Sequence, residues 1–229
     1  MMATTKIEWA NKVWNPVTGC TPISEGCQHC YAARMAKRLA GRYGYPSGDG
    51  FAVTFHQARL NEPLRWKKPR KVFVCSMGDL FHDDVPDDWI KQVFNSMVTD
   101  VLQPCLHTYM ILTKRQNRMA EFFAKNARHG TKPWPNIWLG VTAENQARAD
   151  ERIPILLSIP AAKHFVSVEP MLEPVPLYGL DWVIAGPETG PGARECKPEW
   201  IQDLADQCSG ANVPFFDKRK NFIRREWPT

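Results

Sequence analysis

NIWLGVTAENQARADERIPILLS (residues 136–158) joins a short apolar run to a helical pattern, and this combination decides the fold class of the 229-residue chain. The run from Asn136 to Val141 predicts a buried strand. Asn145 to Ser158 predicts a helix, which Pro154 is expected to break or kink because proline lacks the backbone N–H that the helix needs. A strand followed by a helix is the repeating unit of α/β proteins.

The same unit recurs along the whole chain. Further strands are predicted at Trp14–Val17, Val72–Cys75, His107–Leu112, His164–Val168, Trp182–Ala185 and Val213–Phe216, and further helices at Tyr31–Leu39, Asp87–Thr99, Arg118–Ala127 and Pro198–Cys208. This alternation predicts one α/β domain over residues 1–229, a partial (βα) barrel of about six to seven parallel strands. A doubly wound sheet is the competing architecture. Its dinucleotide-binding version is disfavoured because no Gly-x-Gly-x-x-Gly follows the first strand.

Polar residues follow the predicted strands at the points where the strands end. The carboxyl ends of parallel strands share one edge, which is where ligands bind in such folds. We therefore expect one face to gather Ser76, Asp79, Thr113, Lys114, Thr142, Glu144, Ser167, Glu169 and Glu188.

Three cysteines lie close together in GCTPISEGCQHCY (residues 19–31), just after the first predicted strand. Cys20, Cys27 and Cys30 match the ligand set of a 4Fe-4S cluster that keeps one coordination position open. Structural zinc is the alternative, and it would need His29 or Cys75 as a fourth ligand. A loop without metal is the third possibility.

Composition narrows the class of protein. The hydrophobic fraction of 44% and charged fraction of 23% are ordinary for a soluble globular protein. Seven cysteines, an odd number with four scattered far from the triad, do not resemble a disulfide framework. No apolar run reaches the length of a signal peptide or a membrane span. We expect a cytoplasmic protein with reduced thiols and no membrane partner.

Charge gives a weaker indication. The formal net charge is +5, with basic clusters at Lys67–Lys71 and at Lys218–Lys220, the second followed by Arg224 and Arg225. Such clusters are either solvated surface or a site that attracts an anionic ligand such as nucleic acid.

Several motifs resemble the phage-associated three-Cys-motif proteins, a family of phages and bacteria regarded as radical S-adenosylmethionine-like. The resemblance spans nearly the whole chain and rests on Trp14-Asn15-Pro16-Val17-Thr18-Gly19-Cys20, Gly26-Cys27-Gln28-His29-Cys30-Tyr31-Ala32, Ser76-Met77-Gly78-Asp79-Leu80-Phe81-His82, Leu112-Thr113-Lys114-Arg115 and Val168-Glu169-Pro170. The chain departs from the superfamily's usual Cys-x3-Cys-x2-Cys in having six residues between Cys20 and Cys27. It also has Pro187 where the family typically has glycine.

The resemblance implies a radical-SAM-like core and an enzyme. Cys20, Cys27 and Cys30 would bind a 4Fe-4S cluster, which reduces S-adenosylmethionine to give a 5'-deoxyadenosyl radical. The catalytic assignments are Lys114 and Glu169. The cofactor-binding assignments are Ser76, Asp79, Thr113, Thr142, Glu144, Ser167 and Glu188. A DNA, RNA or nucleotide substrate, for base modification or lesion repair, is expected with an electron donor such as flavodoxin and a family partner protein.

The alternative is a nucleic-acid-binding or accessory protein without turnover, in which the cysteines hold a structural zinc. Its nine tryptophans invite a base-stacking interpretation, but Trp9, Trp14, Trp138 and Trp182 lie in or beside apolar runs. Core packing is the better prediction for these four side chains.

Overall fold

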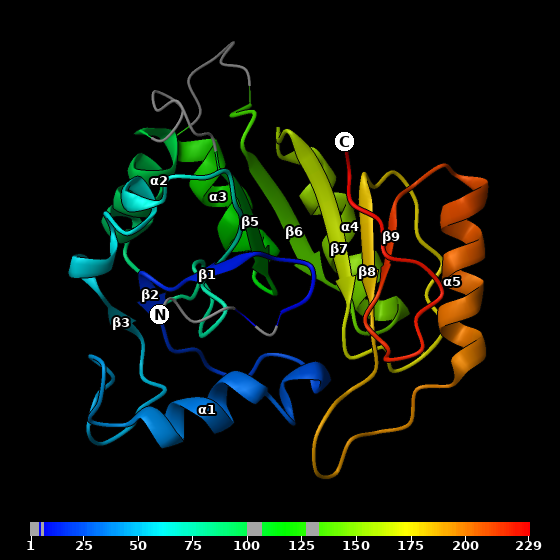
Figure 1. Cartoon of the computed structure of the whole chain (residues 1–229), viewed down its shortest axis with the longest axis horizontal. Helices are drawn as coiled ribbons and strands as arrows, with labels where there is room; N and C mark the ends of the chain where they lie inside the picture. Colours follow the sequence, from blue (N-terminus) through cyan, green and yellow to red (C-terminus); the bar gives the residue numbers. More distant parts are fainter. Residues whose placement is uncertain (1–4, 6, 100–106, 127–132) are drawn as a thin grey trace.

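A computed structural model describes residues 5, 7–99, 107–126 and 133–229. Its main feature is a curled, half-barrel sheet of seven parallel strands in the order β1-β4-β5-β6-β7-β8-β9 (Figure 1). The strands are β1 (Lys12–Trp14), β4 (Lys71–Val74), β5 (Thr108–Thr113), β6 (Ile137–Thr142), β7 (Lys163–Val168), β8 (Trp182–Ala185) and β9 (Phe215–Asp217). Because the spatial order follows the chain order without reversal, the sheet is a partial barrel and not a doubly wound sheet. The predicted fold class is confirmed.

Five α-helices connect these strands within the described part of the chain. They are α1 (Tyr31–Leu39), α2 (Asp87–Thr99), α3 (Gln116–Asn126), α4 (Gln146–Ser158) and α5 (Pro198–Gly210). Short 3-10 turns lie at Glu25–Cys27, Gln57–Arg59 and Pro63–Arg65. None of the described helices combines the length and apolar character needed to span a bilayer.

Two sequence predictions need correction. The strand predicted over Trp14–Val17 is two elements, because β1 ends at Trp14 and Val17 belongs to β2 (Val17–Thr18), which pairs antiparallel with β3 (Thr54–Phe55). Helix α4 also continues through Pro154 without a break. Both Pro154 and Asp150, whose carbonyl loses its helical partner, face solvent, so water can satisfy that carbonyl. The predicted helix end at Ala127 lies outside the described residues.

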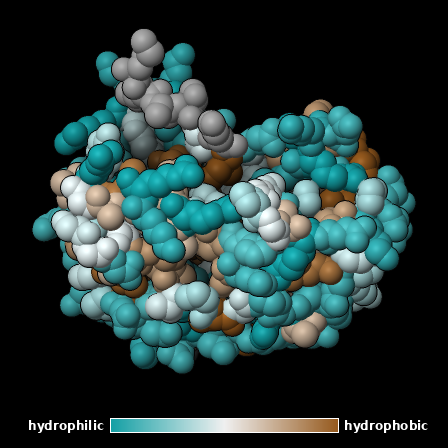
Figure 2. Space-filling view, turned by 90° about the horizontal axis from the view of Figure 1, so that it is seen from below, coloured by the Kyte–Doolittle hydropathy of each residue, from teal (hydrophilic) through white to brown (hydrophobic). Residues whose placement is uncertain are grey.

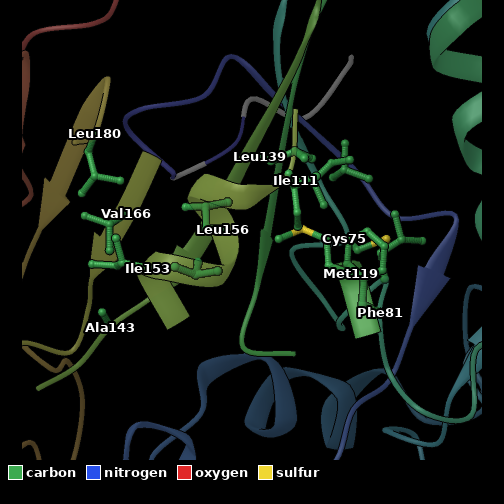
Figure 3. Close-up of a cluster of buried hydrophobic side chains, with 14 of the residues drawn as sticks. Cys75, Phe81, Ile111, Met119, Leu139, Ala143, Ile153, Leu156, Val166 and Leu180 are labelled. Atoms are coloured by element: carbon green, nitrogen blue, oxygen red, sulfur yellow. The ribbon is translucent and has the colours of Figure 1, made fainter. Parts of the chain in front are cut away.

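The larger core lies between the sheet and helices α2 to α5. It combines alternate residues of the strands with the inward faces of the helices, and Figure 3 shows Ile111, Leu139 and Val166 from the strands facing Met119 and Leu156 from the helices. Period-two alternation along each strand sends these side chains to one face of the sheet and their neighbours to the other.

The concave face of the sheet is filled mainly by aromatic side chains. A second cluster there consists of Trp9, Ala10, Phe73, Met110, Trp138, Phe165, Trp182, Ile184 and Phe216. Trp9, which precedes β1, packs against Phe73 with ring centroids 4.5 Å apart and against Trp182 at 6.0 Å. Trp14 belongs to the other core. The prediction that these four tryptophans serve core packing is therefore confirmed.

Gly140 leaves room for this aromatic filling. A Cβ atom at Gly140 would lie 2.6 Å from the Phe165 ring, which is fully buried on the neighbouring strand. Since the ring is enclosed by Trp9 and Trp182, it has no free space into which to move. Glycine is thus the residue that this position of β6 accepts.

Helix α1 differs from the others in its placement. It lies across the carboxyl edge of the half-barrel, below the strand ends in Figure 1, and its buried residues Ala32 and Ala36 pack with Tyr45 and Met77 in a small separate cluster. This helix therefore borders the edge at which ligands bind in parallel βα folds.

The packing at Gly140 gives a testable prediction. Gly140→Ala should lower the free energy of unfolding by about 1–3 kcal/mol, because the added methyl group collides with an immobile ring. Gly210→Ala is the matched control, since a Cβ there meets no atom within 4 Å and helix α5 gains a better helix former. Urea denaturation should show the first variant weakened and the second unchanged or strengthened by roughly 0.5–1 kcal/mol. Equal stability of both variants would contradict the packing described here.

Candidate functional site

The loop that carries Cys20, Cys27 and Cys30 begins after β2, on the carboxyl side of the sheet. All three thiols are free and half-buried. Gly19 forms a parallel bridge with Gly78, which joins the start of the loop to the segment that follows β4. The 3-10 turn at Glu25–Cys27 leads directly to Cys30 and α1. The three cysteines thus lie at the face where the strand ends were predicted to gather.

Glu144 fastens this loop to the end of β6. Its side chain is fully buried, and it accepts hydrogen bonds from the Ser24 hydroxyl, from the Gly26 backbone N–H at 3.3 Å and from Arg152 Nη1 at 2.9 Å. A Cβ at Gly26 would lie 2.6 Å from the carboxylate, so the loop backbone approaches Glu144 as closely as glycine allows. A buried carboxylate needs such partners, and here the loop itself supplies two of them.

Asp79 is a second buried carboxylate that holds residues near the loop, here beside Cys20. Its buried carboxylate accepts bonds from the Thr113 hydroxyl at 2.8 Å, from the Lys114 backbone N–H at 3.2 Å and from Arg115 Nη1 at 3.5 Å. The Arg115 guanidinium also donates to Cys20 Sγ at 3.3 Å and to the Thr21 carbonyl at 3.1 Å. Arg115 therefore connects the first cysteine to the ends of β4 and β5.

Glu188 is the third buried carboxylate beside the cysteine loop, and it holds His29. It accepts two side-chain hydrogen bonds from Arg194, at 2.6 and 3.0 Å, and its Oε2 lies 2.9 Å from His29 Nδ1. The hydrogen bonds from Arg194 lower the pKa of Glu188 to about 2. The carboxylate is thus ionised and holds the ring of His29, a residue that lies between Cys27 and Cys30 in the sequence.

The electrostatic environments of two thiols differ sharply. Burial raises the pKa of Cys20 to about 11, with the Asp79 charge adding to the effect and Arg115 opposing it. At Cys27 burial also acts to raise the pKa. It is outweighed by the Lys114 charge and by hydrogen bonds at Ile23 and Ser24, so that the pKa of Cys27 is lowered. Cys27 is therefore the more readily ionised of these two thiols.

The remaining predicted site residues are spread along the same edge. Ser76 is buried and its hydroxyl donates to the Asn15 side chain at 3.2 Å. Thr142 and Ser167 are buried at the ends of β6 and β7. Glu169, which follows β7, pairs with Lys218, which follows β9. The Lys114 ammonium has no ion-pair partner in the described part of the chain.

Three arginines also belong to the site, and the sequence offered only the first of them, Arg115, as a candidate beside Lys114. Arg115 touches Cys20, Arg152 pairs with Glu144, and Arg194 pairs with Glu188. Only Arg115 carried a sequence signal, since it follows Lys114 directly at a strand end. Arg152 and Arg194 lie on a helix and in a loop, where spacing gives no indication of a partner.

An open groove lies beside the cysteine loop. It has a volume of about 630 Å³ and is lined by Cys27, His29 and Cys30 together with Arg34, Lys37 and Arg38 of α1 and Gly190 and Pro191 of the loop after β8. Cys75 does not reach it, because this residue is buried in the core between sheet and helices (Figure 3).

Cys20, Cys27 and Cys30 have the chemical character needed to bind a cofactor through three thiolates. Within residues 5, 7–99, 107–126 and 133–229, no three His, Cys, Asp or Glu side chains are already gathered into a metal-binding group. Three free thiols on one loop, with the cations of Arg115 at Cys20 and of Lys114 near Cys27, are nevertheless donors of the kind that iron-sulfur clusters and zinc use.

Comparison with known proteins gives the family. Residues 4–226 match DUF5131, described as a protein of unknown function, and the chain belongs to this family. No curated protein and no solved structure matches the chain.

The difference between the thiols can be measured by alkylation. We expect iodoacetamide at neutral pH to modify Cys27 faster than Cys20, because the thiolate is the reactive form and Cys27 has the lower pKa. Lys114→Met should slow the reaction at Cys27 by removing the charge that favours its thiolate. Peptide mass spectrometry of brief reactions gives both rates, with the distant Cys196 as an internal reference. Faster modification of Cys20 would contradict the assignment.

Proposed function

We propose that this protein is a radical S-adenosylmethionine enzyme that holds a 4Fe-4S cluster with Cys20, Cys27 and Cys30 and acts on a component of nucleic acid. The observation that carries the proposal is the placement of three free thiols on one loop at the carboxyl edge of a parallel half-barrel, beside two cations. Cys20, Cys27 and Cys30 would hold the cluster, which, once reduced by an external electron donor, would supply one electron to cleave S-adenosylmethionine to methionine and a 5'-deoxyadenosyl radical.

The residues around the loop divide into two groups under this proposal. Asp79, Glu144 and Glu188 are engaged in internal hydrogen bonds, so their part is to position the loop and its neighbours. The half-buried Lys114 is the group left to pair with the carboxylate of S-adenosylmethionine. Arg115 holds Cys20 and balances its negative charge when that thiol is ionised.

The nucleic-acid substrate is supported by the placement of basic residues. Lys218, Arg219 and Lys220 follow β9 and so lie at the carboxyl edge, together with the cysteine loop. Lys218 and Arg219 pair with Glu169 and Asp217, and Lys220 is the exposed cation of this cluster. Lys67 and Lys68 precede β4 and lie at the opposite edge, where they are exposed. A cation at the carboxyl edge attracts a polyanion toward the thiols, whereas a cation at the opposite edge does not.

A zinc-containing accessory protein is the second candidate, and one observation favours it. The carboxylate of Glu188 holds His29 Nδ1, which leaves Nε2 available, and carboxylate-bound histidines are frequent metal ligands. Cys75 is excluded as the fourth ligand by its burial in the core. This candidate therefore needs His29 beside the three thiols.

The radical proposal predicts a specific effect of Cys30→Ala. The variant should lose formation of 5'-deoxyadenosine from S-adenosylmethionine after anaerobic reconstitution and reduction, because one of three cluster ligands is absent. Cys196→Ala is the matched control, since Cys196 is also half-buried but lies outside the loop, and it should retain activity. Retained cleavage in Cys30→Ala would sink the proposal.

His29→Ala separates the two candidates. Under the radical proposal the variant keeps its iron, because His29 is not a cluster ligand. Under the zinc alternative it should lose its bound zinc to a chelator far more readily, because one of the four ligands is absent. Circular dichroism of both alanine variants distinguishes loss of a ligand from loss of the fold.

A further inference from the structure

Helix α1 presents an exposed face of unusual composition beside the thiols. Ala32 and Ala36 face inward, whereas Tyr31, Arg34, Met35 and Arg38 follow helical spacing along the outward face. The side chains of Tyr31 and Met35 remain 48% and 41% exposed. Tyr31 and Met35 are one helical turn apart, so their exposed parts adjoin on this face.

The charge of this face is entirely positive. Residues 31–43 contain Arg34, Lys37, Arg38 and Arg42 and no acidic residue. None of these four cations has an ion-pair partner among the residues that the structure describes. Arg34 donates one hydrogen bond, from Nη2 to the Thr189 carbonyl at 3.1 Å, and stays exposed.

Three carboxylates near the groove are already neutralised. Glu25 pairs with Arg148, Glu169 pairs with Lys218, and Glu188 pairs with Arg194. The cations of α1 therefore remain uncompensated by these three carboxylates. Figure 2, which views the molecule from the side on which α1 lies, shows that hydrophilic side chains cover most of this face. An extended anion would be attracted to it.

The groove connects these cations to the thiols. Arg34, Lys37 and Arg38 line it along α1, and Cys27 and Cys30 line it at the loop. Its volume of about 630 Å³ is within the range of small-ligand sites. A chain whose backbone lies on the helix can place one of its units in the groove, next to the cysteines.

The exposed ring of Tyr31 indicates that the part of the ligand placed in the groove is itself a flat ring. Its hydroxyl donates to the Ser76 carbonyl at 2.5 Å, so the ring is held in place while about half of the residue remains exposed. A fixed, exposed aromatic ring beside cations is the arrangement on which single-stranded nucleic acids stack their bases. Bases of a duplex are stacked on each other and cannot reach such a ring without being flipped out.

We propose that the outward face of α1 and the adjoining groove bind single-stranded nucleic acid, with phosphates at Arg34, Lys37 and Arg38 and a base stacked on Tyr31. This inference deepens the proposed function, because it names the form of nucleic acid that would bring a nucleotide to the thiols. Binding itself requires neither metal nor S-adenosylmethionine.

The test is the salt dependence of binding. Fluorescence anisotropy of a labelled oligothymidylate with the full chain should give an affinity that falls steeply with salt concentration. The triple variant Arg34→Gln, Lys37→Gln, Arg38→Gln should reduce the slope of log K against log salt by about 2, since each phosphate contact on a single strand contributes about 0.7. The control Arg65→Gln, Lys67→Gln, Lys68→Gln removes the same charge from exposed positions before β4 and should leave the slope unchanged.

Tyr31 variants test the stacking. Tyr31→Leu should weaken binding roughly 10-fold, whereas Tyr31→Phe keeps the ring and should weaken it less. Equal slopes for the α1 variant and the unaltered chain, or equal losses in the two triple variants, would overturn the site. Equal affinity for a duplex of the same length would overturn the single-strand assignment. Because no step uses S-adenosylmethionine, these outcomes are independent of the cleavage assay with Cys30→Ala.

Discussion

The placement of the cysteine loop depends on one buried carboxylate, that of Glu144. A charge removed from water is tolerated when hydrogen bonds and an opposite charge surround it, and removing one partner of such a group is costly. Glu144 receives these bonds from Ser24 and Gly26 of the loop and from Arg152 of α4. The loop, the end of β6 and the first turns of α4 are therefore held as one unit. Arg115 at Cys20 and Glu188 at His29 hold the two ends of the loop, while Glu144 holds its middle.

The aromatic filling of the half-barrel explains why the polar residues of the site lie at its carboxyl edge and not on its concave side. Its concave side has no opposite wall, and Trp9, Trp182 and Phe216 fill it instead. Trp227 closes the same cluster by donating from Nε1 to the Trp9 carbonyl at 3.1 Å. The polar residues at the carboxyl edge remain uncovered by this packing, and α1 borders them. A solid aromatic interior thus supports the polar carboxyl edge of the sheet.

Much of the fold could be predicted from the sequence, because hydrophobic period and strand length are local properties. The strand around Trp138 and the helices Tyr31–Leu39 and Asp87–Thr99 appear where they were expected. The end of the first strand could not be predicted, because Val17 turns away to pair with Phe55, a choice made by distant contacts. For the site, strand-end reasoning identified which polar residues would gather. It could not show that Asp79, Glu144 and Glu188 are occupied by arginines from elsewhere in the chain.

The central claim is that the three thiols serve an iron-sulfur cluster. Metal analysis of the anaerobically reconstituted full chain, combined with electron paramagnetic resonance of the reduced protein, tests it most directly. We expect about four irons per chain and a resonance signal that changes when S-adenosylmethionine is added, since one iron keeps a position open for it. A colourless protein that holds stoichiometric zinc, or a signal that S-adenosylmethionine leaves unchanged, would contradict the account.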